Sequence, residues 1–482
     1  MPRSAGTMLD RRAMNAPFSR LLRLLMMALM LATATVTPAL AQQDQDAGPS
    51  LLRDTETELL FKQMSRPLIV AAGMDPNSVK VALLNDPEIN AFVSKGQTVY
   101  VQSGLLEAAD NVNQLQGVVA HELGHVLAGD SIRSGQGEKQ ATGVALLSLV
   151  LAAAAMAAGA GEAGMGILQA GQRAALGELL AFTRAQEATA DASGAIFLSK
   201  AGISGKGMLD FFAKLQNEEY RYGYYAKDSF DRDHPLSSER IQALEQKLKS
   251  DPAWGKPIDP ALEARFQRVK AKLLGFVNPK QAVIKYPESD QSIPAHYARA
   301  YAYHLGGYPE KAVTEADALL AKDPHDPFFL ELKGQILLEG GMPKEAIPVL
   351  REATQRSNDA PLIATMLGHA LVATDDAKNF PEAKQILKVA VNRDNEDPFA
   401  WYQLGIIYEH EGDEARAALA TAERSNLEGN AKMAYASAEM ALKGITPNTP
   451  DYLRAQDISM VSRAELAKKD KKYRDPKELR SE

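Results

Sequence analysis

A repeat of about 34 residues runs through the C-terminal part of the chain. Glycines within Leu- and Ala-rich helical patterns recur 34 and 37 residues apart, at Gly334, Gly368 and Gly405. Alanines recur at intervals of 34, 37 and 34 residues, at Ala312, Ala346, Ala383 and Ala417. A unit of this length forms one pair of helices, which buries its apolar face only by stacking on the next pair. The sequence therefore predicts an α-solenoid with a concave ligand surface, in preference to an unrelated helical bundle.

The residues that punctuate these units have a familiar pattern. One unit closes at Asp323-Pro324, and another opens with Trp401, Leu404, Gly405 and Tyr408. In this pattern the segment from about 293 to 442 resembles tetratricopeptide repeats, with a three-residue insertion near Lys378. We therefore expect a repeat domain over 290–445. The polar tail over 446–482 carries a run of lysines near its end, which is typical of a solvated helix or terminus, and we assign it no function.

The first 41 residues have the features of a secretory signal peptide. Arginines precede an apolar run from Leu24 to about Val36, and the small-residue sequence Ala39-Leu40-Ala41 comes before Gln42. The alternative, an uncleaved membrane anchor, is less favoured because the apolar run is short for a span. The sequence therefore predicts export through a cleaved signal peptide at 1–41.

Composition narrows the chemistry of the exported chain. Its formal net charge is −7 over all 482 residues, and the first 41 residues contribute five arginines and one aspartate, so the remainder is more acidic still. Nucleic acid is therefore not an expected partner. Cysteine is absent, which excludes a disulfide framework and a thiolate nucleophile. Any metal ion must be held by His, Asp or Glu.

Residues 42–275 carry a different pattern from the repeats. A helical pattern over 51–72 precedes three short strand-like runs, which lie at 79–84, 89–93 and 98–101, and a helix is expected over 111–128. That helix contains His121-Glu122-Leu-Gly-His125, the H-E-x-x-H pattern. Residues i and i+4 share one helix face, so both imidazoles can bind one metal ion. Glu122 flanks the ion without binding it and is the expected general acid and base of peptide hydrolysis.

A catalytic zinc ion needs a third protein ligand and one open position. The segment from Arg184 to Gly194 places Glu187 and Asp191 four residues apart on a second helix. Glu187 can reach the metal, and Asp191 can orient a ligating histidine through its ring N–H. Taken alone, such a pair is more often part of a solvated helix face, so the prediction depends on its combination with the histidines.

Twenty-one residues without a charge, 141–161, raise the question of a membrane span. A single crossing would put the expected metal ligands on opposite sides of the bilayer. The following segment, 162–182, has too many charged and polar residues for a return crossing. We therefore expect a buried or lid-forming helical hairpin, with shallow contact to a membrane surface as the alternative.

Together these motifs resemble a known family. The His121-Glu122-x-x-His125 set, Arg184-x-x-Glu187-x-x-x-Asp191 and His234-Pro235 with Arg240-Ile241 resemble the zinc peptidases related to HtpX and the CAAX prenyl endopeptidases. The resemblance implies a gluzincin-like domain that binds one zinc ion per chain through His121, His125 and Glu187. It also implies that His234 lies at the active site and that Arg240 braces it. Thr189 replaces a glutamate that is frequent in the family, without loss of an expected ligand.

The signal peptide and the repeats narrow the resemblance to BepA-like periplasmic members of this family. The resemblance implies a mainly α-helical protein with a small β-sheet, located in the periplasm. It implies that the protein degrades unfolded or stalled outer-membrane proteins and binds the β-barrel assembly machinery. It also implies chaperone activity. A chaperone or scaffold with a largely silent metal site is the alternative, and a membrane-embedded peptidase is a less favoured one.

Two features leave more than one interpretation open. The segment Asn90-Ala91-Phe92 is either an ordinary core strand or an edge that receives an extended substrate by β-addition. His234 lies in a polar, Asp-rich stretch that predicts a loop before the helix of Arg240. It can stabilise the oxyanion of the reaction, or bind the metal as a fourth ligand and hold the enzyme latent, which we favour. A helix-capping surface histidine is the remaining alternative.

Overall fold

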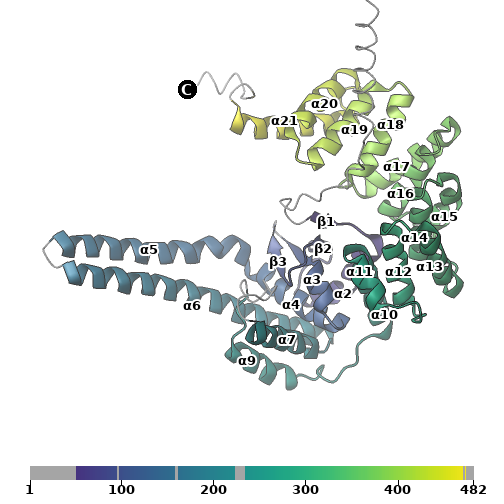
Figure 1. The fold of residues 1–482 in the computed structure, drawn as a ribbon. Coiled ribbons are helices and arrows are strands. Elements are labelled where there is room, and N and C mark those ends of the chain that lie inside the picture. The colour runs from purple at the N-terminus through teal and green to yellow at the C-terminus, as the bar shows by residue number, and fades with distance from the viewer. Residues whose placement is uncertain (1–49, 95–96, 158–160, 223–233, 471–472, 474–482) are drawn as a thin grey trace, which may run out of the picture. The chain divides into compact units, whose positions relative to one another are not determined.

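The computed structural model describes residues 50–94, 97–157, 161–222, 234–470 and 473 (Figure 1). These described residues belong to one compact unit, Ser50–Glu482. The predicted signal peptide, the polar start of the exported chain and most of the C-terminal tail lie outside the described residues. The loop predicted before His234 also lies outside them, whereas His234 itself is described.

The first described part of the chain begins with a strand and not with a helix. Its first elements are β1 (Ser50–Leu52), α2 (Thr55–Ala71), β2 (Lys80–Asn85), β3 (Ala91–Ser94) and β4 (Thr98–Gln102). The helix predicted from residue 51 was therefore placed too early, because Leu51 pairs with Leu84 of β2. The helix starts only after Asp54, whose carboxylate accepts a hydrogen bond from the Thr57 backbone N–H. The three strands predicted from the sequence are confirmed.

In the described part of the chain, four strands form one sheet in the order β1-β2-β4-β3. β2 runs parallel to β4, while β1 and β3 run antiparallel to their neighbours. β3 is consequently an edge strand, and it also packs against the helix that carries the H-E-x-x-H motif. Phe92 of β3 stacks on Tyr100 of β4 with 5.4 Å between ring centroids, which fixes the register of this edge.

The helices that follow the sheet surround the site. They are α3 (Ser103–Ala108), α4 (Val112–Ala128), α5 (Asp130–Ala157), α6 (Gly161–Ala201), α7 (Lys206–Tyr222), α9 (Ser238–Lys249), α10 (Pro260–Val277) and α11 (Pro279–Lys285). The predicted helix over 111–128 is α4, which begins after Asn111, whose side chain accepts from the Gln114 N–H. One apolar core joins α2, the sheet, α4, α6, α7, α9 and α10.

Small residues let α4 and α6 approach each other closely. A Cβ atom at Gly124 would lie 2.7 Å from the Cα atom of Ala190, and one at Gly194 would lie 3.1 Å from the backbone of Ala120. Gly124 stands between His121 and His125 on α4, and Ala190 stands between Glu187 and Asp191 on α6. The crossing therefore brings the two sets of expected ligands together.

The uncharged segment forms a helical hairpin, but the hairpin is not buried. α5 and the first half of α6 run side by side (Figure 1). The large apolar side chains of α5 are half to two-thirds exposed, and they are Leu146, Leu147, Leu149, Val150 and Leu151. Of the two expectations for this hairpin, buried or lid-forming, burial was wrong, because the helices pack along each other and leave these described side chains exposed. No helix in the described ranges is long and apolar enough to cross a membrane.

The repeats consist of antiparallel helix pairs. Their helices are α12 (Ile293–Leu305), α13 (Pro309–Lys322), α14 (Pro327–Glu339), α15 (Pro343–Arg356), α16 (Pro361–Val372), α17 (Phe380–Arg393), α18 (Pro398–His410), α19 (Glu414–Leu427), α20 (Ala431–Gly444) and α21 (Pro450–Lys469). The insertion predicted near Lys378 is a short 3₁₀ turn, Ala377–Asn379. The predicted solenoid of helix pairs is confirmed.

Contacts inside each pair explain the period seen in the sequence. A Cβ atom at Gly334 would lie 2.3 Å from Leu350 of the partner helix, and one at Gly368 would lie 2.6 Å from Leu387. The periodic alanines are on the second helix of each pair, and all four are buried. Small residues at Gly334 and Gly368 allow the close approach of their helix pairs, whereas a Cβ atom at Gly405 would meet Ala420 only at 3.7 Å.

Candidate metal centre

The two histidines of the motif lie on one face of α4, as their spacing predicts. His121 is fully buried and His125 is 9% exposed, and their Nε2 atoms are 3.2 Å apart. Glu187 of α6 faces them across the helix crossing. Its carboxylate oxygens lie 3.4 Å from Nε2 of His121 and 3.5 Å from Nε2 of His125.

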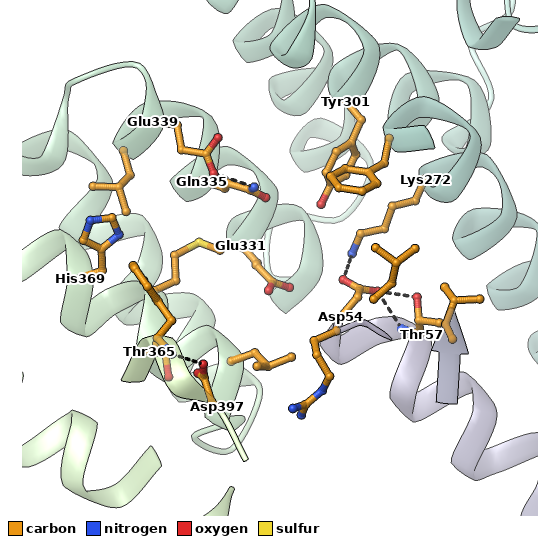
Figure 2. A pocket seen from close by; sticks show the side chains of 18 of the residues that line it. Asp54, Thr57, Lys272, Tyr301, Glu331, Gln335, Glu339, Thr365, His369 and Asp397 are labelled. Carbon is orange, nitrogen blue, oxygen red and sulfur yellow. Dashed lines mark hydrogen bonds and ion pairs between the residues drawn. The ribbon is translucent and has the colours of Figure 1, made fainter. Parts of the chain in front are cut away.

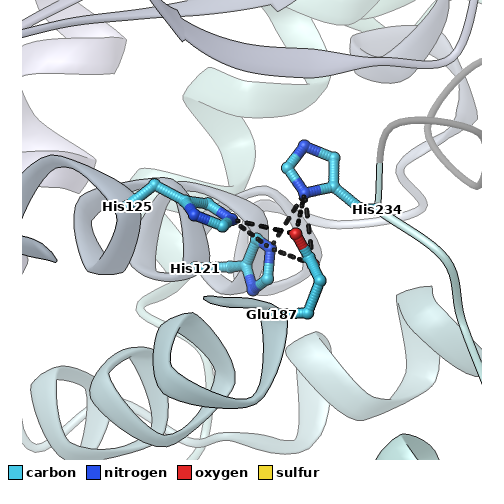
Figure 3. Close-up of side chains that lie close together, drawn as sticks. All are labelled: His121, His125, Glu187 and His234. Carbon is cyan, nitrogen blue, oxygen red and sulfur yellow. Dashed lines mark hydrogen bonds and ion pairs between the residues drawn. The ribbon is translucent and has the colours of Figure 1, made fainter. Parts of the chain in front are cut away.

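His234, which lies four residues before α9, completes the group (Figure 3). Its Nδ1 atom lies 3.3 Å from Nε2 of His121 and 3.2 Å from Oε1 of Glu187. His234 is only 7% exposed, so the alternative of a surface histidine that caps a helix is wrong. The cap of α9 is Ser237, whose side chain accepts from the Arg240 N–H.

The spacing of these four donors fits a metal ion of a particular size. One ligand atom from each of His121, His125, Glu187 and His234 lies within 4.8 Å of all the others. Zinc binds nitrogen and oxygen at about 2.0–2.2 Å, which separates tetrahedral ligands by about 3.3–3.6 Å. The separations of five of the six donor pairs are 3.2–3.5 Å, which is close to the edges of that tetrahedron. Three nitrogens and one carboxylate also match the donor types that zinc accepts.

Carboxylates hold the far nitrogens of both motif histidines. Nδ1 of His121 lies 3.0 Å from Oδ1 of Asp191, as the sequence predicts for an orienting contact. Nδ1 of His125 lies 2.8 Å from Oδ2 of Asp130. With Nδ1–H as donor in each case, Nε2 of both rings is left to face the metal position. Gln186 donates to the other oxygen of Asp130.

Sequence reasoning missed Asp130. The chain turns at Gly129, where φ is +70° and α4 ends, so the first residue of α5 points back at the last turn of α4. A carboxylate five residues after a ligating histidine and directly after a C-terminal glycine is the signal that could have identified it. Phe212 of α7 was also missed, and its ring packs edge-on against His121 at 5.5 Å.

Arg240 lies behind the ligands. It donates two hydrogen bonds of 2.8 Å to Asp191, and its Nη1 lies 3.0 Å from Oε2 of Glu187. Nη1 also donates to the backbone carbonyls of His234 and Pro235. Arg240 thus connects α6 to the segment that carries His234, which is the bracing position that the family resemblance implies. These contacts make it a positioning residue and not a group at the reacting atoms.

Glu122 faces the same space without a hydrogen-bond partner. Its side chain is 1% exposed, and neither carboxylate oxygen has a hydrogen bond within the described residues. The nearest charged group is Nε2 of His234, 3.6 Å from Oε1. A buried carboxylate without a donor is costly unless a bound species supplies one. This arrangement suits a general base that takes a proton from a bound nucleophile.

The carboxylates dominate the electrostatics of the site. Burial lowers the pKa of His121, but Asp191 and Glu187 outweigh burial and raise that pKa to about 10. Burial raises the pKa of Glu187, but His121 and His234 outweigh it and hold the pKa of this carboxyl far below its usual value. The pKa of His234 is raised, because Glu122 and Glu187 outweigh its burial. The four-donor site therefore favours a bound cation.

The fold and this site define a metalloendopeptidase domain followed by helical repeats. Residues 55–248 match peptidase family M48.

Named relatives agree with this family. The chain is 27% identical over 341 residues to the beta-barrel assembly-enhancing protease of Escherichia coli K12, covering 67% of each protein. It is 26% identical to the protein of that name from Yersinia pestis, covering 60% of each. It is 34% identical to the E. coli metalloprotease LoiP, over 36% of this chain and 64% of that protein. The chain thus spans about two thirds or less of these relatives' lengths.

Solved structures of repeat proteins resemble part of this chain. The tetratricopeptide protein YrrB aligns with 36% of this chain and 92% of its own, at 18% identity and a TM-score of 0.30. The assignment of the repeats therefore rests on the helix pairs described above.

Proposed function

We propose that this chain is a zinc-dependent endopeptidase of the periplasm that degrades misassembled outer-membrane β-barrel proteins. The observation that carries the metal assignment is the spacing of the four donors His121, His125, Glu187 and His234. The names of the relatives support the substrate class, since several are called beta-barrel assembly-enhancing proteases. The predicted signal peptide at 1–41 supports the periplasmic location.

The chemistry follows from the positions of the side chains. A zinc ion held by these donors would supply Lewis-acid chemistry, which lowers the pKa of water to about 7 and polarises the scissile carbonyl. Glu122 then accepts the proton of the attacking water and passes it to the leaving amine. His121, His125 and Glu187 hold the ion, while Asp191 and Asp130 fix the orientation of the two motif histidines. Arg240 contacts Glu187, Asp191 and the backbone of His234, and so fixes the positions of these three residues relative to one another.

His234 gives the site a closed form. With Nδ1 at the fourth corner of the donor set, no corner is left for water or for a peptide carbonyl. We propose that the enzyme is latent in this form and active when the His234 segment moves. Stabilisation of the oxyanion by the imidazole is a second role that we propose for His234 in the active form. The same closure favours the second candidate function, a chaperone or scaffold of outer-membrane assembly whose metal site is mostly silent.

The edge of the sheet offers a place for an extended substrate. β3 is unpaired on one side within the described residues, and it packs against α4. A peptide that adds to β3 by backbone hydrogen bonds would lie along the helix that carries the metal ligands. This position supports β-addition over the alternative of an ordinary core strand.

The repeats are proposed to bind clients or the β-barrel assembly machinery, within the proposed limits of 290–445. The proposed peptidase domain spans 42–275. Contact with a membrane surface is a further proposal, supported by the exposed leucines of α5.

Glu122→Gln tests the enzymatic proposal. The variant should retain the metal and the fold, because no ligand changes, and should lose cleavage of casein about 100-fold or more. Metal content by elemental analysis and initial cleavage rates are the measurements. Glu178→Gln, on the exposed face of α6, is the matched control and should behave like the wild type. Near-normal cleavage by Glu122→Gln would rule out this mechanism, and a metal other than zinc would rule out the metal assignment.

A further inference from the structure

A cavity of about 390 Å³ lies where the first part of the chain meets the repeats, and none of its lining residues is a metal ligand (Figure 2). β1 and the start of α2 form one wall with α10. The opposite wall comes from α12, α14, α16 and the start of α18. Cavities of this size between structural elements are typical of binding sites.

The basic groups that line the cavity are already paired. Nζ of Lys272 lies 2.5 Å from Oδ1 of Asp54, and the guanidinium of Arg53 contacts both Glu58 and Asp394. Burial lowers the pKa of the His369 imidazole, so this ring is neutral at neutral pH. The cavity therefore has no free cation for an anionic ligand.

The acidic groups are not all paired. Glu331 of α14 is 6% exposed, and its Oε2 atom has no hydrogen-bond partner among the described residues. Figure 2 shows its carboxylate pointing into the cavity. The hydroxyl of Thr365 on α16 is also buried without a partner among the described residues. Asp397 adds a second carboxylate to the lining, and its Oδ1 accepts from the Phe399 backbone N–H. Burial raises the pKa of Glu331 to about 8, although Lys272 acts against it. The wall thus presents one carboxylate oxygen and one hydroxyl that lack a hydrogen-bond partner among the described residues.

Apolar side chains surround these acceptors. Phe276 and Phe399 are 41% and 42% exposed at the cavity, and Leu338, Leu362 and Met366 complete the apolar lining. A ligand that fits both features has apolar groups on either side of a cationic group. A guanidinium suits the polar part, since its planar donors can bond a carboxylate and a hydroxyl together and its faces stack on aromatic rings.

We infer that this cavity binds an arginine side chain within an apolar segment of an unfolded client polypeptide. The inference deepens the client-binding role proposed for the repeats and rests on it. The chain's own residues 42–49 are a poor occupant, because they carry two aspartates and no lysine or arginine. The charge of the cavity therefore favours a segment supplied by another polypeptide.

Peptide binding to the full chain in a Glu122→Gln background tests the inference, because this background binds without cleaving. The probe is the acetylated and amidated peptide Ser-Leu-Phe-Arg-Leu-Ser with a fluorescent label. Its matched control replaces arginine with citrulline, which keeps the shape and removes the charge. The arginine peptide should bind about 10- to 100-fold more tightly than the citrulline peptide.

The Glu331→Gln variant tests whether the preference for the arginine peptide over the citrulline peptide arises in this cavity. It keeps the size of the side chain, so the fold should remain, and the preference for arginine over citrulline should fall to near one. Glu345→Gln, on the exposed face of α15, should leave the preference unchanged.

Equal affinities for the two peptides, or no measurable binding of either, would overturn the inference. An arginine preference that persists in Glu331→Gln would do the same. If removal of residues 474–482 tightened binding of the arginine peptide, the occupant would be the chain's own C-terminal tail, which carries Arg474 and Arg480, and the inference would be wrong. Failure of the proposed enzymatic function would appear separately, as wild-type protein that does not cleave casein.

Discussion

At the scale of single residues, the proposed metal centre depends on groups that lie behind the four candidate donors. Asp130 holds Nδ1 of His125 at 2.8 Å and receives a second hydrogen bond from Gln186. Such contacts fix the tautomer of a ligating imidazole and increase its basicity. Asp130 therefore belongs to the site as much as Asp191 does, although it comes from a different helix.

Asp130→Asn should weaken metal binding by about 10- to 100-fold, because the amide no longer fixes the Nδ1–H tautomer of His125. Competition with a chromogenic chelator measures the affinity. Asp457→Asn removes an exposed carboxylate on α21 and should leave the affinity unchanged. An unaltered affinity in Asp130→Asn would mean that the carboxylate only caps the start of α5.

His234→Ala should raise basal cleavage of unfolded substrates, because the fourth corner of the donor set becomes free for water and peptide. Initial rates on casein, with metal content measured in parallel, give the answer. His325→Ala changes an exposed histidine of the repeats and serves as the control. A collapse of activity with the metal retained would instead assign His234 to oxyanion stabilisation.

Some residues of the candidate site could be predicted from the sequence and others could not. His121, His125 and Glu187 follow from ligand spacing on helices, which depends only on local geometry. Asp130 and Phe212 reach the histidines through a chain reversal and through tertiary packing. The position of Nδ1 of His234 between His121 and Glu187 is also a tertiary property, so the sequence left its role open.

At the scale of elements, the crossing of α4 and α6 is the structural basis of the site. Gly124 on α4 contacts the backbone of Ala190 on α6, between the ligand pairs of the two helices. Any side chain at residue 124 would separate the helices and move Glu187 away from the histidines. Packed interiors resist such additions because little free volume is present.

Gly124→Ala should therefore lower the free energy of unfolding by about 1–3 kcal/mol and reduce metal affinity at the same time. Thermal unfolding and chelator competition are the measurements. Gly177→Ala on α6 is the matched control, because a Cβ atom there meets nothing within 4 Å. The control should be neutral or stabilising by about 0.5–1 kcal/mol. A stable, metal-binding Gly124→Ala protein would show that the crossing tolerates more space than the structure indicates.

The sequence did not predict those features of the helices and strands that depend on contacts with distant parts of the chain. β1 has too few residues to be recognised alone and exists because Leu51 pairs with Leu84. The hairpin of α5 and α6 was predicted as helical, which is correct, but its apolar composition also predicted burial. Leu147 and Val150 remain 62% and 65% exposed, since nothing in a sequence shows whether a partner face exists.

At the scale of the whole molecule, the first part of the chain and the repeats share a buried network of charges. Arg268 of α10 contacts Glu56 of α2 and Asp326 at the start of α14, each at 2.8 Å. The hydroxyl of Tyr297 on α12 donates to Glu56 at 2.8 Å. The period near 34 predicts the solenoid, but it contains no information about these contacts across some 240 residues. The packing between the two parts was accordingly absent from the sequence prediction.

Glu331 makes the stability of the whole chain depend on pH in a specific direction. Burial, with the charges of Asp54, Glu56 and Asp326, raises the pKa of Glu331 to about 8 against the opposing effect of Lys272. The folded chain then holds a proton on Glu331 that the unfolded chain releases near pH 4.5. The contribution of this proton to stability is complete below pH 4.5 and is lost as the pH rises towards 8.

Glu331→Gln removes that dependence while keeping the shape of the side chain. The midpoint of thermal unfolding should be similar in variant and wild type near pH 5, and the variant should become increasingly more stable towards pH 8.5. At high pH the free energies of unfolding of the variant and the wild type should differ by about a few kcal/mol. Glu345→Gln on exposed α15 should track the wild type throughout. Parallel curves for Glu331→Gln and wild type would mean that Glu331 is ionised at neutral pH, with its charge balanced inside the cavity by Lys272.

The pH dependence of thermal unfolding can also be measured with the arginine peptide present. The curves of the variant and the wild type should then converge, because a bound guanidinium replaces the proton on Glu331 in the wild type and has no carboxylate to pair with in the variant.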